Sequence, residues 1–215
     1  MRRFFVQRDK STPPSSVSAL RVGETLFTGE DDFASEFGAP SSLEADLLLL
    51  ASAVFAADRA QARGERENVC RNFELSIPIV NHARLYPLIF HIERILYHLS
   101  NDAWKLEFRQ ASGVPEGHFR TPKEKGRTLL FSGGLDSLAA AIEFGKSPGS
   151  IQLVSHKTRN RINDASQKGL YRILKNKGYK LKHYQCFISS RSGGVSDLQH
   201  DEENTQRTRS FVFLI

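Results

Sequence analysis

Six consecutive residues combine two serines, two glycines and an aspartate around one leucine: Ser132-Gly133-Gly134-Leu135-Asp136-Ser137. The apolar run before them, residues 128–131, predicts a buried strand, and residues 138–144 predict the first turns of a helix. Glycine lets a backbone approach a ligand closely, and the free N–H groups and dipole of a helix N-terminus attract anions. This spacing predicts a phosphate cradle, with the serines as added donors and Asp136 as a candidate metal contact.

The other common phosphate-binding motifs are absent from the sequence. A Walker A loop requires G-x-x-x-x-G-K-[ST], and a dinucleotide-binding turn requires G-x-G-x-x-G; neither pattern occurs. A nicotinamide or flavin cofactor is therefore not indicated. The alternative interpretation of residues 132–137 is an ordinary glycine turn ahead of an amphipathic helix.

Composition and charge restrict the class of protein. The chain has 215 residues, a net charge of +6 and 40% hydrophobic residues, which suits a globular protein with an anionic ligand. Its two cysteines, Cys70 and Cys186, form no C-x-x-C pair, so no zinc or dithiol motif is present. The stretch 47–57 is about half the roughly 20 residues that span a bilayer. We therefore expect a cytoplasmic protein with no membrane partner.

The first 112 residues predict a small α+β domain. Strand or helix patterns alternate along it: a strand at 1–8, a Ser/Pro-rich loop at 9–19, a helix from Ser41 to about Arg63, a strand at 73–79, a helix at 85–99 and a strand at 104–108. Ser41 and Glu44 have the spacing of a capping box. We interpret the charged stretch that begins at Asp58 as a solvated helix end, and Pro78 as the mark of an edge strand.

A Gly- and Pro-rich segment, 113–126, predicts a linker, and residues 127–215 predict an α/β domain. Its strand–helix order indicates a parallel, doubly wound sheet whose ligand lies at the carboxyl ends of the strands. Residues 132–137, 155–161 and 207–210 are expected to converge there. The final apolar run, 211–215, predicts a helix cut in its first turns, so we expect the natural polypeptide to continue.

The Ser132–Ser137 segment resembles the PP-loop, S-G-G-x-D-S, of the ATP pyrophosphatases. Together with residues 207–214 it resembles the 7-cyano-7-deazaguanine synthases of queuosine biosynthesis. It resembles more closely their homologues in anti-phage defence islands, the Qat-system and type IV CBASS synthase-like proteins, which carry an extra N-terminal α+β region. The resemblance covers residues 127–215 and implies an adenine nucleotide alpha hydrolase-like fold.

The resemblance also implies a reaction. Members of the family activate a carboxylate with ATP and Mg²⁺, release pyrophosphate, and let ammonia attack the adenylate; the carboxylate here would be deazaguanine-like. By position, phosphate binding falls to all six residues of the loop: Ser132, Gly133, Gly134, Leu135, Asp136 and Ser137. Asp136 and Arg209 take catalytic roles, Asp136 also as the Mg²⁺ ligand. His156 either contacts the nucleotide or caps the end of a strand.

Two departures from the family accompany the resemblance. The zinc-binding cysteines of the family have no counterpart, so zinc is expected only in a C-terminal part beyond Ile215. The family's Asp-Tyr-Gly-Gln-Arg-His-type segment, which shapes the substrate pocket, is replaced by residues 155–161.

Two other functions stay open at this point. A PP-loop tRNA-modifying enzyme suits the basic charge, and nucleic acid remains a candidate partner, although the paired cysteines of sulfur-inserting members are missing. A non-catalytic nucleotide-binding subunit of a defence complex would contact partner proteins through residues 1–112.

Overall fold

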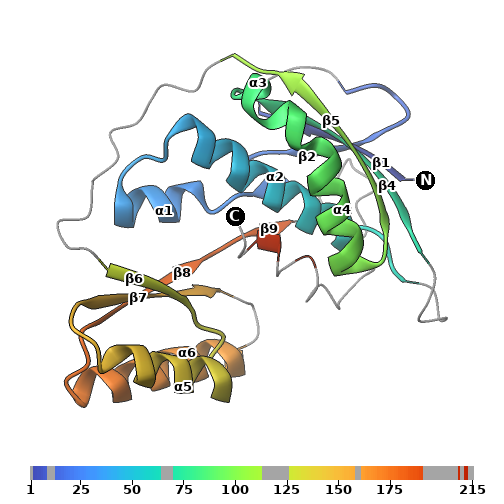
Figure 1. The fold of residues 1–215 in the computed structure, drawn as a ribbon. Helices are drawn as coiled ribbons and strands as arrows, with labels where there is room; N and C mark the ends of the chain where they lie inside the picture. Colours follow the sequence, from blue (N-terminus) through green and yellow to red (C-terminus); the bar gives the residue numbers. More distant parts are fainter. Residues whose placement is uncertain are drawn as a thin grey trace. The chain divides into compact units, whose positions relative to one another are not determined.

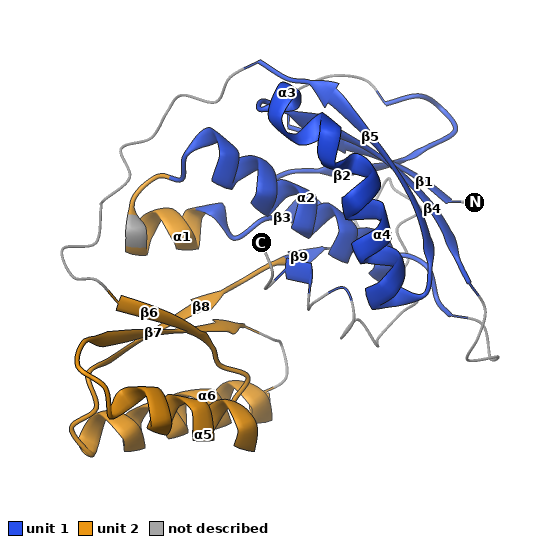
Figure 2. Cartoon of the chain, in the orientation of Figure 1, with its two compact units in different colours: residues 1–30, 40–118, 189–215 blue, residues 31–39, 119–188 orange. Residues whose placement is uncertain are grey.

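The structure, a computed structural model, describes residues 2–8, 13–63, 70–112, 126–157, 161–190, 208 and 211–212. The chain divides into two compact units (Figure 2). Unit 1 comprises residues 1–30, 40–118 and 189–215, and unit 2 comprises residues 31–39 and 119–188. Residues 189–215 thus group with unit 1, whereas the sequence-based division placed them in the second domain. Nearly all of the predicted linker lies outside the described residues.

Unit 1 contains most of the elements of the chain (Figure 1). In chain order they are β1 (Arg2–Gln7), β2 (Ser18–Arg21), β3 (Leu26–Phe27), α1 (Glu30–Phe37, shared with unit 2), α2 (Ser42–Arg59), β4 (Asn72–Ile79), α3 (His82–Leu85), the 3₁₀ turn η1 (Tyr86–Leu88), α4 (Ile89–Ser100), β5 (Ala103–Gln110) and β9 (Ser189–Ser190). Four of the strands form one all-parallel sheet in the order β2-β1-β4-β5, and β3 pairs with β9 in antiparallel fashion.

The parallel sheet corrects the predicted α+β class of the N-terminal part, which is α/β. Alternating apolar residues identified β4 and β5, but a period of two residues carries no information on strand direction. The helices between these strands act as crossovers. Two parallel neighbours need a connection that returns the chain to the end of the sheet at which the first strand began.

The core of unit 1 lies between the sheet and its helices. The buried apolar side chains of β1, β4 and β5 come from alternate positions, and α2 and α4 cover them: Phe4, Val6, Phe73, Leu75, Ile77, Ile79, Trp104, Leu106 and Phe108. The predicted capping box is confirmed. Ser41 caps α2 by accepting from the Glu44 N–H, and the Glu44 carboxylate accepts from the Ser41 N–H.

The expectation that Pro78 marks an edge strand is wrong, because β4 lies between β1 and β5. The register explains how an interior strand tolerates the proline. β1 pairs with β4 only from Phe73 to Ser76, so Pro78 lies beyond the pairing and no hydrogen bond to β1 is lost.

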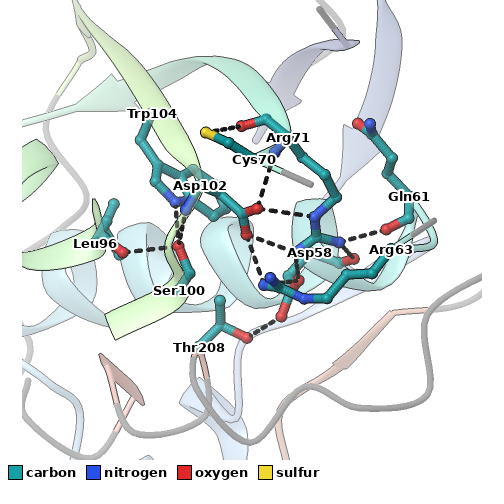
Figure 3. Close-up of polar contacts among 10 residues, drawn as sticks. All are labelled: Asp58, Gln61, Arg63, Cys70, Arg71, Leu96, Ser100, Asp102, Trp104 and Thr208. Carbon is teal, nitrogen blue, oxygen red and sulfur yellow. Dashed lines mark hydrogen bonds and ion pairs between the residues drawn. The ribbon is translucent and has the colours of Figure 1, made fainter. Parts of the chain in front are cut away.

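Asp58, near the end of α2, is buried, contrary to the expectation of a solvated helix end, whereas Arg59 and Arg63 are half-buried and residues 64–69 lie outside the described residues. Asp58 and Asp102 have no exposed surface, and the guanidinium of Arg71 contacts both carboxylates (Figure 3). Arg63 adds a second ion pair to Asp102 at 2.7 Å. Arg71 and Asp102 directly precede β4 and β5, so this cluster ties the amino ends of two strands to the end of α2.

Unit 2 contains a second parallel sheet. Its elements are β6 (Gly126–Leu130), α5 (Leu135–Gly145), β7 (Ser150–His156), α6 (Arg161–Asn176) and β8 (Leu181–Cys186), with strand order β6-β7-β8. Both helices pack on one face of this sheet (Figure 1), around an apolar cluster that includes Phe131, Leu153 and Leu174. The prediction of a parallel α/β sheet here is confirmed, and its described part is compatible with half of a doubly wound fold. None of the described helices is long and apolar enough to cross a bilayer.

Candidate phosphate-binding site

The Ser132–Ser137 loop joins the carboxyl end of β6 to the amino end of α5. Phe131 extends the strand, since its N–H donates to the Val154 carbonyl of β7 at 2.7 Å. Gly134 is the N-cap of α5, with φ −89° and ψ 173°, and the first helical bond runs from the Leu138 N–H to its carbonyl. The predicted strand, turn and helix are therefore confirmed around the motif.

Gly133 is the residue that makes the turn. Its φ is +83°, in the left-handed region that side chains with a Cβ avoid. A Cβ at this position would also lie 3.0 Å from Cγ and 3.3 Å from the backbone nitrogen of Gln167. Both the conformation and the packing against α6 require glycine at the second position of the motif.

Three consecutive carbonyl groups at the base of the loop are held by side chains from outside it. The Phe131 carbonyl accepts from the Ser155 hydroxyl of β7. The Ser132 carbonyl accepts from Nε2 of Gln167 at 3.2 Å, and the Gly133 carbonyl from Oγ of Ser166 at 3.1 Å. In a trans peptide the C=O and the next N–H point in opposite directions. The N–H groups of residues 132–134 are therefore turned away from these anchors.

The start of α5 adds further donors to the same loop. No side chain caps this helix, so the N–H groups of residues 135–137 have no partner inside it. The loop serines form a small internal network. The Ser137 hydroxyl donates to the Gly134 carbonyl at 2.9 Å, and Oγ of Ser132 lies 3.2 Å from Oγ of Ser137 and accepts from the Gly134 N–H at 3.3 Å. Ser132 and Gly134 are exposed, and Leu135 is 79% exposed. The loop thus presents backbone donors and hydroxyl groups to solvent beside the positive end of a helix dipole.

Asp136, the predicted metal contact, lies exposed in the first turn of α5. The described residues contain no group of three His, Cys, Asp or Glu side chains that could hold a metal by themselves. A single carboxylate suits Mg²⁺, which commonly takes one or two carboxylates and completes its shell with substrate phosphates and water.

The other predicted site residues are not brought together with the loop in the described structure. His156 is 7% exposed and its Nε2 lies 3.1 Å from the Ile188 carbonyl, a contact that ties the end of β7 to the chain after β8. Arg209 lies outside the described residues, between Thr208 and Phe211, which are both buried in unit 1. Of the segment 155–161, Lys157 and Arg161 are exposed and residues 158–160 are not described.

Ser155 and His183 form a hydroxyl–imidazole pair at 2.9 Å, which could suggest a nucleophile and its base. Ser155 has no exposed surface, and its proton is donated to the Phe131 carbonyl. His183 Nε2 therefore donates to the serine oxygen, and burial lowers the pKa of its imidazole, with opposed smaller effects from Asp164 and Lys168. The pair supports the loop and has no access to substrate.

Sequence inspection placed Ser155 among the residues that converge on the loop, and it donates to the Phe131 carbonyl. It missed Ser166, Gln167 and Gln185, although the helix and the strand that carry them were predicted. Ser166 and Gln167 are in α6, about thirty positions after the motif, and Ser155 and Gln185 are in β7 and β8. Their meeting depends on the strand order β6-β7-β8, which no local pattern encodes. A pocket lined by Arg127, Phe144 and Pro148 lies at the amino ends of β6 and β7, away from the loop.

Comparisons with protein-family models, with curated proteins and with solved structures give no match for this chain. No family is shown by relatives. A function therefore has to be inferred from the loop of residues 132–137, the side chains that hold it and the motif that it carries.

Proposed function

We propose that this protein is an ATP-dependent ligase of the 7-cyano-7-deazaguanine synthase-like kind, which adenylates a carboxylate and releases pyrophosphate. The observation that carries the proposal is the Ser132–Ser137 loop. It combines the PP-loop motif with a parallel strand, a left-handed glycine and an uncapped helix start, and residues 132 and 134–136 are exposed. By the resemblance, the setting would be cytoplasmic anti-phage defence or deazapurine modification.

The loop suits the pyrophosphate that leaves in such a reaction. A carboxylate oxygen attacks the α-phosphorus of ATP, the bond to the bridging oxygen of the β-phosphate breaks, and the electron pair departs with pyrophosphate. The N–H groups of the loop and the dipole of α5 stabilise this added negative charge. The hydroxyls of Ser132 and Ser137 would exchange their bonds within the loop for bonds to the phosphate oxygens. Ammonia then displaces AMP from the adenylate and forms the C–N bond of an amide. In the family a further activation converts this amide to a nitrile.

Asp136 is the residue that we assign to magnesium. Bound there, Mg²⁺ would neutralise charge on the phosphate oxygens. The carboxylate projects from the first turn of α5, one residue before Ser137, so it belongs to the same loop as the phosphate donors. Arg209 remains the proposed second cation of the site, by the resemblance alone.

Pyrophosphate release tests the proposal. The purified chain is incubated with ATP and Mg²⁺, with and without 7-carboxy-7-deazaguanine, and compared with Asp136→Ala. Glu143→Gln is the matched control, because Glu143 is an exposed acidic residue of the same helix that pairs with Lys146 on the surface. We expect substrate-dependent release that Asp136→Ala lowers by a factor of about a hundred or more and that Glu143→Gln leaves unchanged.

The same experiment separates one of the two other candidates. ATP binding without pyrophosphate release would indicate a nucleotide-binding subunit, and absence of ATP binding would overturn the PP-loop assignment. For a sulfur-inserting tRNA enzyme, a thiolate would be needed. Burial raises the pKa of Cys186 to about 11, which keeps this thiol protonated at neutral pH and disfavours that alternative.

A further inference from the structure

Gln167 has a role at the loop that the motif does not reveal. It lies in the second turn of α6, only 4% exposed, and its two amide atoms have different partners. Nε2 donates to the Ser132 carbonyl at 3.2 Å, and Oε1 accepts from Nε2 of Gln185 at 3.0 Å. Because Gln185 occupies the acceptor, the donor of the Gln167 amide is directed to the loop.

Gln185 is itself oriented by a charged group. Its Nε2 also donates to Oδ1 of Asp164 at 2.9 Å, and Oδ2 of Asp164 accepts from Lys168 at 2.7 Å. The chain of contacts thus runs from an ion pair on α6, through the end of β8, to Gln167 and the loop. The hydrogen bonds from Lys168 and Gln185 lower the pKa of Asp164, which keeps the carboxylate ionised as an acceptor.

The loop depends on Gln167 in two independent ways. The hydrogen bond to the Ser132 carbonyl fixes the peptide that follows, and with it the direction of the Gly133 N–H. The stem of Gln167 also fills the space where a Cβ of residue 133 would lie, at 3.0 Å. The side chain therefore packs against the one residue of the turn that has a left-handed backbone.

We propose that Gln167 is a positioning residue, which fixes the loop before the ligand arrives so that the Gly133 N–H group binds a phosphate oxygen. The inference rests on the proposed function, because the ligand is the phosphate group that the loop would take. Hydrogen-bond donors that are held in place before binding need no reorganisation when negative charge appears on the ligand. They therefore stabilise that charge more strongly than mobile donors do. Gln167 touches no ligand; it acts through the Ser132 peptide.

Two substitutions isolate the donor. Gln167→Met keeps the length of the side chain and removes both hydrogen bonds, whereas Gln167→Glu keeps an acceptor for Gln185 and faces the Ser132 carbonyl with an oxygen. Leu174→Val is the matched control, because Leu174 is a buried core residue of the same helix, 2% exposed, with an apolar side chain. The probe is inorganic pyrophosphate with Mg²⁺, titrated by calorimetry, and the thermal midpoint Tm is measured for each variant.

We expect both substitutions at Gln167 to raise the Kd for pyrophosphate about tenfold, because both remove the hydrogen bond to the Ser132 carbonyl. Leu174→Val should lower the Tm and leave the Kd unchanged. A second readout, the ¹⁵N order parameters of Gly133 and Gly134 in the ligand-free protein, should fall in the Gln167 variants only. A merely structural role would move the Tm and leave the order parameters and the Kd as in Leu174→Val.

The outcomes separate this inference from the proposed function. Tight pyrophosphate binding by the wild type that Gln167→Met leaves unaltered would overturn the positioning role and keep the phosphate site. Absence of binding by the wild type would overturn the phosphate site and the ligand-directed role of Gln167 together. Unchanged order parameters in both variants would also overturn the positioning role, whatever the affinity.

Discussion

The hydroxyl of Thr208 donates a hydrogen bond of 2.5 Å to Oδ2 of Asp58, across 150 positions of the chain. Both residues have no exposed surface, and Phe211, three positions after Thr208, is part of the same core. Burial raises the pKa of the Asp58 carboxyl, and hydrogen bonds from Thr208 and Arg71 work against this shift. The late segment is therefore bound to unit 1 through a polar contact that also helps to keep a buried carboxylate charged (Figure 3).

Thr208→Val should destabilise unit 1. Valine has nearly the shape of threonine but no donor, so a buried carboxylate oxygen loses a partner, at a cost of about 1–3 kcal/mol in the free energy of unfolding. Urea unfolding followed by the fluorescence of Trp104, the only tryptophan, reports on unit 1 because this residue lies in its core. Thr208→Ser keeps the hydroxyl and should lose much less; equal losses in the two variants would contradict the role of the hydrogen bond.

Gly133→Ala should weaken both the fold of unit 2 and phosphate binding. A non-glycine residue at φ +83° costs roughly 1–2 kcal/mol, and the new methyl group must displace Gln167. We expect at least tenfold weaker binding of pyrophosphate by calorimetry, a change of about 1.4 kcal/mol. Gly169→Ala is the control: it lies inside α6 with no atom within 4 Å of the added Cβ, and should stabilise the helix by about 1 kcal/mol. Unaltered binding by Gly133→Ala would contradict the loop geometry.

His183 should make the stability of unit 2 depend on pH. Burial lowers its pKa from 6.5, so below about pH 6.5 the unfolded chain binds a proton that the folded state resists. This contribution to stability is complete above pH 6.5 and decreases as the pH falls towards the lowered pKa. Thermal unfolding followed by circular dichroism between pH 5 and 8 checks the slope. His183→Asn keeps an amide donor for Ser155 without the titration, and should show a shallower slope than the wild type.

Local patterns were sufficient for most of the elements and for the turn and helix start of residues 132–137. Sequence patterns describe short segments, and three correct predictions are properties of such segments. They are the capping box of α2, the alternation of β4 and β5, and the strand and helix around Gly133. The parallel direction of β1, β4 and β5 was missed because it depends on how crossovers pack, and the short β2 was missed within a polar stretch.

The contacts that long sequence separations create could not be predicted. Asp58 looked like a surface charge because its partners Arg71 and Asp102 are distant in sequence and carry no shared motif. Gln167 looked like an ordinary polar residue of an amphipathic helix, and its meaning depends on the position of Ser132 in a neighbouring strand–turn unit. In both cases a polar residue gains its role from tertiary neighbours that only the fold brings near.

The Thr208–Asp58 bond also has a consequence for biosynthesis. The ribosome releases residues 40–118 early, yet the core that they form includes Phe211, which emerges almost a hundred residues later. All of residues 119–188 leave the ribosome in between, so the second sheet can complete its hydrogen bonds while the core of the first still lacks Phe211. Folding of that intervening segment shortens the flexible chain that the final closure must order, and so lowers its entropic cost.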